Sequence, residues 1–257
     1  MSKLAAQDKF LDLSDYGRTI GTFIANQLKN TRFTPIHVTL VFGVSGLTAI
    51  YFILENQYLL AAFFFFFKSI IDAADGELAR LKNTPSYTGR YLDSVFDIIL
   101  NFLFLMTICY VSNGNFFLAF LAFFGIQLQG TLYNYYYVIL RNKSVGGDTT
   151  SKVFEYKSPR ALPGESQKSV DILFKIYTIV YGVFDKIIHA MDKDAYKVKT
   201  FPNWFMTLVS IYGLGFQLLI IAVMLLLNLI DYIIPFLIVY TSLIFVLIGI
   251  RKKKFKV

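Results

Sequence analysis

Residues 72–97 read DAADGELARLKNTPSYTGRYLDSVFD, and this acidic stretch lies within a strongly apolar part of the chain. Its four aspartates are Asp72, Asp75, Asp93 and Asp97. An ionised aspartate near the centre of a lipid-facing helix costs about 2.5–3.5 kcal/mol, so these side chains must face water, a cation or one another. The stretch therefore indicates a functional cluster and a helical membrane fold around it.

Helical spacing places the aspartates on two faces that can meet. Asp72 lies one turn before Gly76 with Asp75 beside it, and Asp93 lies one turn before Asp97. The intervening residues 81–88 include a proline and other residues that disfavour a continuous helix. A tight connection there would bring the two acidic faces together.

Converging carboxylates repel one another strongly at low dielectric unless protons or cations intervene. A divalent cation resolves this conflict, and ligation by oxygen alone favours Mg²⁺ or Mn²⁺, which usually bind substrate phosphates as well. We therefore predict a metal site with the ligands Asp72, Asp75, Asp93 and Asp97.

The pattern D-x2-D-G-x2-A-R-x8-G-x3-D-x3-D resembles the signature of the integral-membrane CDP-alcohol phosphotransferases, and all eight fixed positions are filled. The resemblance implies that the early aspartates bind the cations that hold a diphosphate, and that Asp97 acts as the catalytic general base. It also implies transfer of a substituted phosphate from a CDP-linked donor to an alcohol, with release of CMP. Homodimers are expected on the same ground.

Five further residues are candidate substrate contacts. The planar guanidinium of Arg80 suits a diphosphate, and Gly76 leaves room for a nucleotide. Ala79 and Gly89 are small residues of the kind that let membrane helices approach closely. Lys68 lies one turn deeper than Asp72, where it is either a pairing partner for the excess carboxylate charge or a contact to substrate phosphate.

Composition supports an all-α polytopic membrane protein, since 56% of the residues are hydrophobic and 16% are charged. An amphipathic interfacial helix is expected near the N-terminus, where apolar residues from Phe10 to Leu28 recur at helical spacing. The charged and apolar segment Val170–Met191 is interpreted as a second interfacial helix. Six spans are expected at Pro35–Leu54, Leu59–Lys82, Thr88–Val111, Phe116–Leu140, Asn203–Leu227 and Ile230–Ile250.

The distribution of lysine and arginine predicts that both termini and the acidic motif lie on the cytosolic side of the cytoplasmic membrane, because the loops expected outside carry neither residue. No cleavable signal peptide is apparent. A single domain of residues 1–257 is expected. It begins with a cytoplasmic amphipathic segment at residues 1–34 and a four-helix part that holds the site at 35–140. A cytoplasmic connection follows at 141–202, and the last two helices with a basic tail occupy 203–257.

The net charge of +8 is dispersed among cytoplasmic connections, which favours attraction to anionic lipid over nucleic-acid binding. The reaction itself stays open between two directions. Phosphatidyl transfer from CDP-diacylglycerol to a polar alcohol is favoured over transfer of phosphocholine or phosphoethanolamine to diacylglycerol. A non-catalytic transporter or scaffold would explain the acidic residues but not the spacing of Gly76, Ala79 and Arg80.

Overall fold

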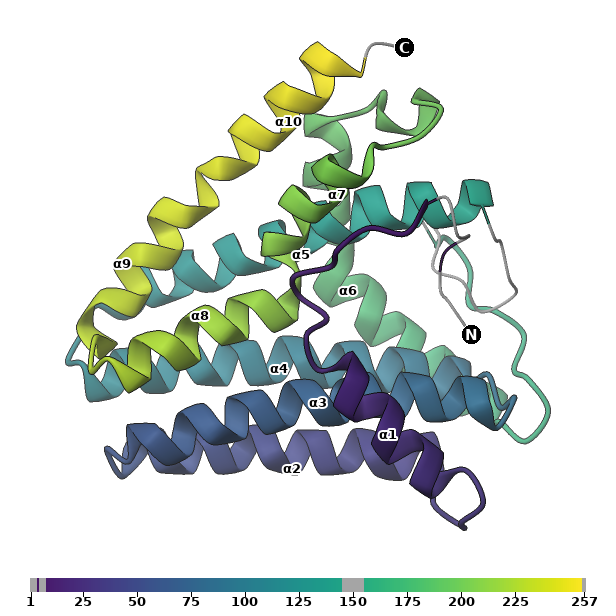
Figure 1. Ribbon diagram of the computed structural model, residues 1–257, viewed down its shortest axis with the longest axis horizontal. Helices are drawn as coiled ribbons and strands as arrows, with labels where there is room; N and C mark the ends of the chain where they lie inside the picture. The colour runs from purple at the N-terminus through teal and green to yellow at the C-terminus, as the bar shows by residue number, and fades with distance from the viewer. Residues whose placement is uncertain (1–3, 5–7, 145–154, 256–257) are drawn as a thin grey trace.

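The computed structural model describes residue 4, residues 8–144 and residues 155–255 (Figure 1). Within these residues the chain is helical and contains no β-strand. The expectation of an all-α fold is therefore confirmed. The helices are α1 Arg18–Leu28, α2 Pro35–Leu54, α3 Tyr58–Leu81, α4 Tyr87–Val111, α5 Phe116–Ser144, α6 Gln167–Met191, η2 Ala195–Lys197, α7 Asn203–Val209, η3 Ser210–Tyr212, α8 Leu214–Leu226, α9 Ile230–Thr241 and α10 Leu243–Lys254.

Consecutive helices run antiparallel among α2, α3 and α4, which carry the acidic motif on α3 and α4, and α2 packs against both of the others (Figure 1). Short connections join them, and each turn contains an asparagine with a positive φ, Asn56 or Asn83. Asparagine tolerates this left-handed conformation because its side chain can hydrogen-bond locally. Ser86 begins α4 as its N-cap, accepting a hydrogen bond from the Gly89 N–H at 2.8 Å.

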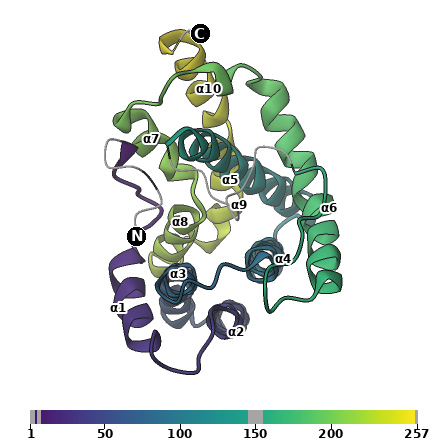
Figure 2. The same ribbon diagram turned by 90° about the vertical axis from the view of Figure 1, so that its right-hand side faces the viewer.

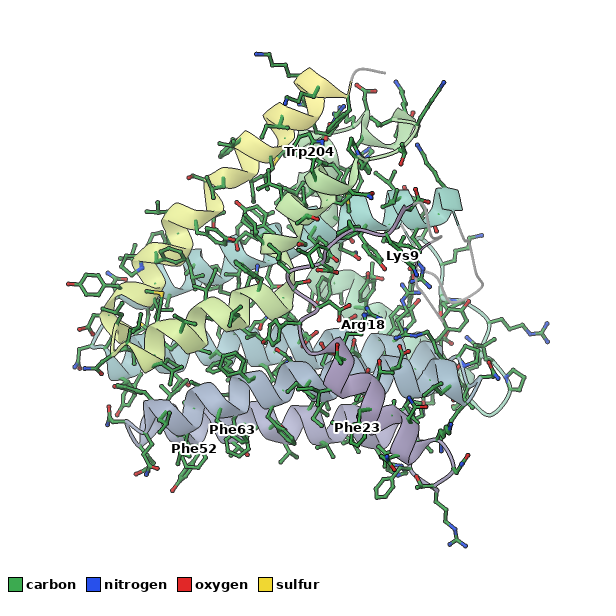
Figure 3. The ribbon with its side chains drawn as sticks, in the orientation of Figure 1. Lys9, Arg18, Phe23, Phe52, Phe63 and Trp204 are labelled. Atoms are coloured by element: carbon green, nitrogen blue, oxygen red, sulfur yellow. The ribbon has the colours of Figure 1, made fainter. Side chains whose placement is uncertain are left out.

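The other helices pack around these three. Viewed along the three helices, α8 lies between α3 and α5, and α6 covers the outer side of α4 (Figure 2). Within the core, the fully buried Phe65 of α3 meets Phe104 of α4 with ring centroids 4.6 Å apart. Phe63, two residues earlier, is 58% exposed on the outer edge of the bundle (Figure 3). The phenylalanine run of α3 therefore serves both the core and the outer surface.

Four of the described helical segments are long and apolar enough to cross a membrane: α2, α4, α5, and α9 with α10. A fifth counts if α7 and α8 form one bent span. Helix α3 falls outside this set because its second half contains four charged residues, Asp72, Asp75, Glu77 and Arg80. Helix α6, at 25 residues, also falls outside it. The structure thus supports four to five of the six expected spans.

The fifth expected span, Asn203–Leu227, is not a continuous helix. It bends by 53° between Tyr212 and Leu214. The backbone of Gly213 is extended there, and a Cβ at Gly213 or Gly215 would overlap Ser14. The absence of side chains at these two glycines therefore leaves room for the N-terminal chain to cross the start of α8.

The N-terminal helix is shorter than its apolar pattern predicts. Only Arg18–Leu28 is helical, and residues 8–17, which we call the strap, cross the bundle without forming an α-helix. The Asp12 side chain accepts hydrogen bonds from the Ser14 N–H and hydroxyl at 3.0 and 2.7 Å. Such local turns by aspartate and serine compete with helix formation. The prediction of one amphipathic helix from Phe10 onward is therefore wrong for the strap.

The C-terminal basic run, Arg251 to Lys254, begins with a buried residue. Arg251 is 3% exposed and forms a buried ion pair with Asp192, whose carboxylate also accepts a hydrogen bond from the Tyr136 hydroxyl at 2.7 Å. This contact joins α10 to α5 and to the end of α6. Arg251 thus stabilises the bundle rather than extending a solvated basic tail.

Candidate metal centre and its two clefts

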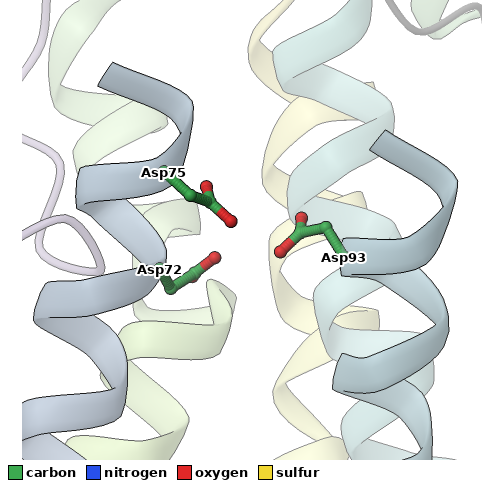
Figure 4. A group of neighbouring side chains, drawn as sticks. All are labelled: Asp72, Asp75 and Asp93. Atoms are coloured by element: carbon green, nitrogen blue, oxygen red, sulfur yellow. The ribbon is translucent and has the colours of Figure 1, made fainter. Parts of the chain in front are cut away.

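Three aspartates converge between α3 and α4. Asp72 and Asp75 project from α3 toward Asp93 of α4 (Figure 4). Each offers a carboxylate oxygen, and these oxygens all lie within 4.8 Å of one another. The turn at residues 82–86 brings the two acidic faces together as the sequence predicts. We call Asp72, Asp75 and Asp93 the three-carboxylate group.

The surroundings of this group suit a hard cation. One Asp93 oxygen, Oδ1, is buried with no hydrogen-bond donor among the described residues. Asp75, which is 8% exposed, accepts a hydrogen bond from the Thr39 hydroxyl of α2 at 2.7 Å. A buried carboxylate oxygen without a donor, beside a second carboxylate that an outer hydroxyl orients, matches the ligand arrangement of divalent-metal sites. The residues therefore fit Mg²⁺ or Mn²⁺ held by Asp72, Asp75 and Asp93.

Asp97 lies one turn deeper and has a different partner. Its Oδ1 accepts a hydrogen bond from Lys68 Nζ at 2.7 Å, and the Lys68 side chain is fully buried. Lys68 Nζ also lies 4.6 Å from the centre of the Phe42 ring. Lys68 thus pairs with the excess carboxylate charge, the first of its two predicted roles. Its contact with substrate remains a prediction, and Asp97 does not belong to the three-carboxylate group.

An arginine-rich cleft opens on the α2 side of the group, with a volume of about 450 Å³. The predicted residues Gly76, Ala79, Arg80 and Gly89 all line it. A Cβ on Gly76 would meet only Arg80 atoms, at 3.7 Å or more, so the space beside it is open. Arg90 of α4 and Arg141 of α5 contribute two further guanidinium groups; we call this space the arginine cleft.

Neighbouring carboxylates hold two of these arginines. Arg80 donates from Nε to Glu77 Oε2 at 2.9 Å and forms an ion pair with the same carboxylate through Nη2. Arg90 pairs with Glu155, whose second oxygen accepts from the Tyr91 hydroxyl at 2.7 Å. These contacts fix the guanidinium groups at the edge of the cleft before any ligand binds.

Gly89 lies close to the N-cap of α4 and is less close to the neighbouring helix α2. Its N–H binds the Ser86 hydroxyl, and a Cβ would lie 3.3 Å from that oxygen but 4.0 Å from Ile36 of α2. The close helix contacts expected of small residues occur elsewhere: Gly46 of α2 packs against Leu100 of α4. The absence of a side chain at Gly89 therefore protects the N-cap.

A second cleft, of about 330 Å³, adjoins the first where the strap, α5 and the start of α8 meet α3 and α4, and the two clefts share Asp75, Gly76, Arg80 and Asp93. All four motif aspartates line it, whereas only Asp75 and Asp93 also line the arginine cleft. The strap contributes Asp12 and Asp15, and Arg18 follows at the start of α1 (Figure 3). We call this space the strap cleft.

The loop before α6 forms hydrogen bonds with the start of α4, beside the arginine cleft. Glu165 accepts hydrogen bonds from the Ser86 hydroxyl at 2.8 Å and from the Thr88 N–H at 2.7 Å. Burial alone would raise the pKa of Glu165, but these and other hydrogen bonds outweigh it and lower that pKa from its ordinary value of 4.5. The carboxylate therefore stabilises this loop in its ionised form.

Sequence reasoning missed several residues that build the site. Glu77 lies three residues before Arg80 within the quoted stretch, so helical spacing could have identified this pair. Thr39 is 36 positions from Asp75 in sequence, and no local pattern signals their contact. The strap was also missed, since its contacts with Tyr133 and Ser210 are separated by more than 100 positions in sequence.

Comparison with known proteins agrees with this geometry. Residues 32–163, just over half of the chain, match the family described as CDP-alcohol phosphatidyltransferase. A protein of Archaeoglobus fulgidus named bifunctional IPC transferase and DIPP synthase is 33% identical over an alignment of 113 positions, which covers 40% of this chain and 23% of that relative. The match thus spans about a quarter of the relative's length. No solved structure matches the chain.

Proposed function

We propose, because the chain belongs to the CDP-alcohol phosphatidyltransferase family, that it is a membrane enzyme that transfers a phosphatidyl group from CDP-diacylglycerol to a polar alcohol and releases CMP. The observation that carries this proposal is the three-carboxylate group between two clefts. Transfer of a phosphoryl group needs a charge-neutralising centre with a donor on one side and an acceptor on the other, because the entering and leaving oxygens lie roughly in line.

Asp72, Asp75 and Asp93 are the proposed ligands of Mg²⁺ or Mn²⁺. When bound, such an ion would neutralise charge on the diphosphate and orient it. Thr39 holds the Asp75 carboxylate in place for this role. The proposed fourth ligand, Asp97, is supported by the resemblance alone, because its Oδ1 is paired with Lys68.

The arginine cleft suits the CDP diphosphate. Arg80 presents a planar guanidinium that can form two parallel hydrogen bonds to phosphate oxygens, and the open space beside Gly76 can admit the nucleotide. Arg90 and Arg141 add positive charge to the same cleft. We assign the donor to this cleft, with Ala79 and Gly89 shaping its wall.

The strap cleft is then the acceptor side. Asp97 lines this cleft and not the arginine cleft, which supports the proposal that it receives the proton of an acceptor hydroxyl. The hydroxyl oxygen forms a bond to the β-phosphorus, the bond from that phosphorus to the CMP oxygen breaks, and CMP leaves. Lys68 holds Asp97 in position and stabilises its negative charge before the proton is transferred, so the transfer occurs late, as attack proceeds.

The membrane arrangement that fits this function has six spans. Helix α3 would cross beside α2 and α8, with its charged half at the cytosolic end, and α7 with α8 would form a bent span. Helices α1 and α6 would lie at the interface, with both termini and both clefts toward the cytosol of a cytoplasmic membrane. A single domain of residues 1–257 and a homodimer complete this proposal.

Two other functions make different experimental predictions. Transfer of phosphocholine or phosphoethanolamine to diacylglycerol would use the same centre with the lipid as acceptor. A transporter or scaffold would release no CMP. The test is CMP release by the purified protein in lipid micelles with Mg²⁺ or Mn²⁺, comparing two substrate pairs. These are CDP-diacylglycerol with pooled polar alcohols, and CDP-choline or CDP-ethanolamine with diacylglycerol.

Metal-dependent release with only the first pair supports the proposal. Release with only the second pair reverses the roles of lipid and headgroup. If folded protein releases no CMP with either pair, the transferase proposal is wrong for these donors. A matched Asp72→Asn variant, which keeps the size of the side chain but removes its charge, controls for contaminating activity.

A further inference from the structure

Helix α6 lies across two of the candidate spans instead of running along one of them. Figure 2 shows α2, α3 and α4 end-on and α6 from its side. The first half of α6 packs on α4, where the rings of Phe174 and Tyr91 have centroids 5.7 Å apart. Its second half reaches α5, where the centroids of Phe184 and Phe124 are 5.0 Å apart. Because α4 and α5 are apolar enough to cross a membrane, α6 lies where lipid would otherwise cover their sides.

The outer face of α6 carries an apolar stripe. Its four members recur at intervals of four, three and four residues, which places them on one side of the helix. They are 38–64% exposed, and we call them the α6 stripe: Ile172, Ile176, Ile179 and Val183. One edge of the stripe continues into half-buried apolar residues, Leu173, Val180 and Ile187. A helix with such a face, packed beside membrane spans, is suited to contact with acyl chains.

The other edge of the stripe carries three exposed lysines, Lys168, Lys175 and Lys186, which we call the lysine row. They are separated by 7 and 11 residues, close to two and three helical turns. Each lies three or four residues from a member of the stripe, so the row follows one edge of it. Within the part of the chain that the structure describes, none of the three forms an ion pair.

Two acidic residues of α6 do not cancel the charge of the row. The Asp171 carboxylate is already engaged, accepting hydrogen bonds from the Ser158 hydroxyl and the Gln167 amide at 2.5 and 2.8 Å. Burial raises the pKa of Asp185 to about 7, so this carboxyl carries only part of a negative charge near neutral pH. The exposed edge of α6 is therefore positively charged overall.

We propose that α6 docks on the lipid leaflet at the end of the bundle that holds the clefts, with its stripe among acyl chains and its lysine row on anionic phospholipid headgroups. Lysine suits this position because its stem covers apolar surface while its ammonium reaches the headgroup phosphates. Docking of this kind rests on the membrane arrangement in the proposed function and adds a lipid partner to it. It is measurable without transferase activity, so failure of the docking and failure of the enzyme function are distinguishable.

The first test places a single tryptophan on either of two neighbouring faces of α6. The chain has one tryptophan, so Trp204→Phe provides the background for Ile179→Trp on the stripe. Thr178→Trp is the matched control, since it is also exposed but lies one residue earlier, about 100° around the helix. The full chain is reconstituted in phosphatidylcholine vesicles, and fluorescence is quenched by lipid brominated on its acyl chains or by acrylamide in the water.

We expect the brominated lipid to quench Ile179→Trp at least two-fold more strongly than Thr178→Trp, and acrylamide to show the reverse order. Equal quenching of the two variants by brominated lipid would overturn the docking. Shielding of Ile179→Trp from both quenchers would also overturn it, because a second protein copy would then cover the stripe.

The second test measures the headgroup preference in Ile179→Trp. Quenching by brominated phosphatidylglycerol and by brominated phosphatidylcholine gives the relative association constant of the two lipids at α6. One lysine near an anionic surface contributes roughly five-fold to binding, so we expect at least a five-fold preference for phosphatidylglycerol. Replacing all three lysines of the row with glutamine should bring this preference within two-fold of equality.

A matched control makes the same change of charge after the end of α6, by Lys193→Gln, Lys197→Gln and Lys199→Gln together. This control should keep the preference for phosphatidylglycerol. No preference with the lysines intact, a preference that survives loss of the row, or an equal loss in the control would overturn the assignment of the row to anionic headgroups.

Discussion

The Thr39 hydroxyl offers a sharp test of the metal centre, because it acts on the site without touching a proposed metal directly. Its Oγ1 lies 2.7 Å from Asp75 Oδ2 and 3.1 Å from the Pro35 carbonyl oxygen. A hydroxyl has one proton, and the shorter contact to the charged oxygen takes it. Thr39 is 2% exposed, so water does not replace this donor easily.

Replacing Thr39 with valine keeps the shape of the side chain and removes the donor. A hydrogen bond to a charged group contributes about 1.5–3 kcal/mol, and loss of an outer contact to a metal ligand typically lowers metal affinity about 10- to 100-fold. We expect Mn²⁺ affinity to fall within that range, with a smaller loss of kcat at saturating Mn²⁺. Thr39→Ser, which keeps the hydroxyl, should stay near the unmodified protein.

The assay is Mn²⁺ titration of purified protein in detergent, in which electron paramagnetic resonance measures the concentration of the free ion at each step. Thermal unfolding without metal checks that both variants are folded. If Thr39→Val binds Mn²⁺ within two-fold of the unmodified protein, Asp75 does not depend on Thr39 and the account of this ligand is wrong. An equal loss in Thr39→Ser would point to packing instead of the hydrogen bond.

Four further predictions concern the motif and its surroundings. Asp72→Asn should weaken Mn²⁺ and nucleotide binding, whereas Asp97→Asn should lower kcat more than nucleotide affinity; full activity in both would refute the mechanism. Arg80→Lys should raise the Kd for CDP about ten-fold or more despite its retained charge, because the bidentate geometry is lost, and an unchanged Kd would remove this residue from the donor site. Lys68→Met should destabilise the protein by about 3–5 kcal/mol in denaturant unfolding by leaving Asp97 unpaired, and adding Asp97→Asn should recover part of that loss. The lowered pKa of Glu165 contributes stability that is present above its ordinary value of 4.5 and lost as pH falls through the lower folded value, so the thermal midpoint should decline less in Glu165→Gln as the pH is taken from above 4.5 to well below it.

The sequence predicted the convergence of three of the four aspartates, because the signals for it are local. Helical spacing placed Asp72 and Asp75 on one face and Asp93 on another, and the residues between them predicted the turn that brings these faces together. The position of Lys68, one turn deeper than Asp72, correctly indicated a partner for excess negative charge. Periodicity and local turn residues are sufficient for such inferences within one helical hairpin.

The walls of the site could not be predicted in this way, because they depend on contacts between distant segments. The apolar spacing of Phe10, Leu13 and Tyr16 fits a helix, but Asp12 and Ser14 form a local turn that competes with it. The space for this strap arises from Gly213, about 200 positions later in the chain. The hydropathy of residues 203–227 also predicts a straight span, because no feature of these residues alone indicates that the strap crosses them.

The measurement that tests the central claim most directly is location of Mn²⁺ by its anomalous X-ray scattering in crystals grown with Mn²⁺ and CDP. The account predicts Mn²⁺ between α3 and α4, in contact with carboxylate oxygens of Asp72, Asp75 and Asp93, with the diphosphate on the arginine-cleft side. Asp93→Asn crystals should lose or weaken that signal. Mn²⁺ bound away from these carboxylates, or CDP bound at full occupancy with no metal beside it, would contradict the account.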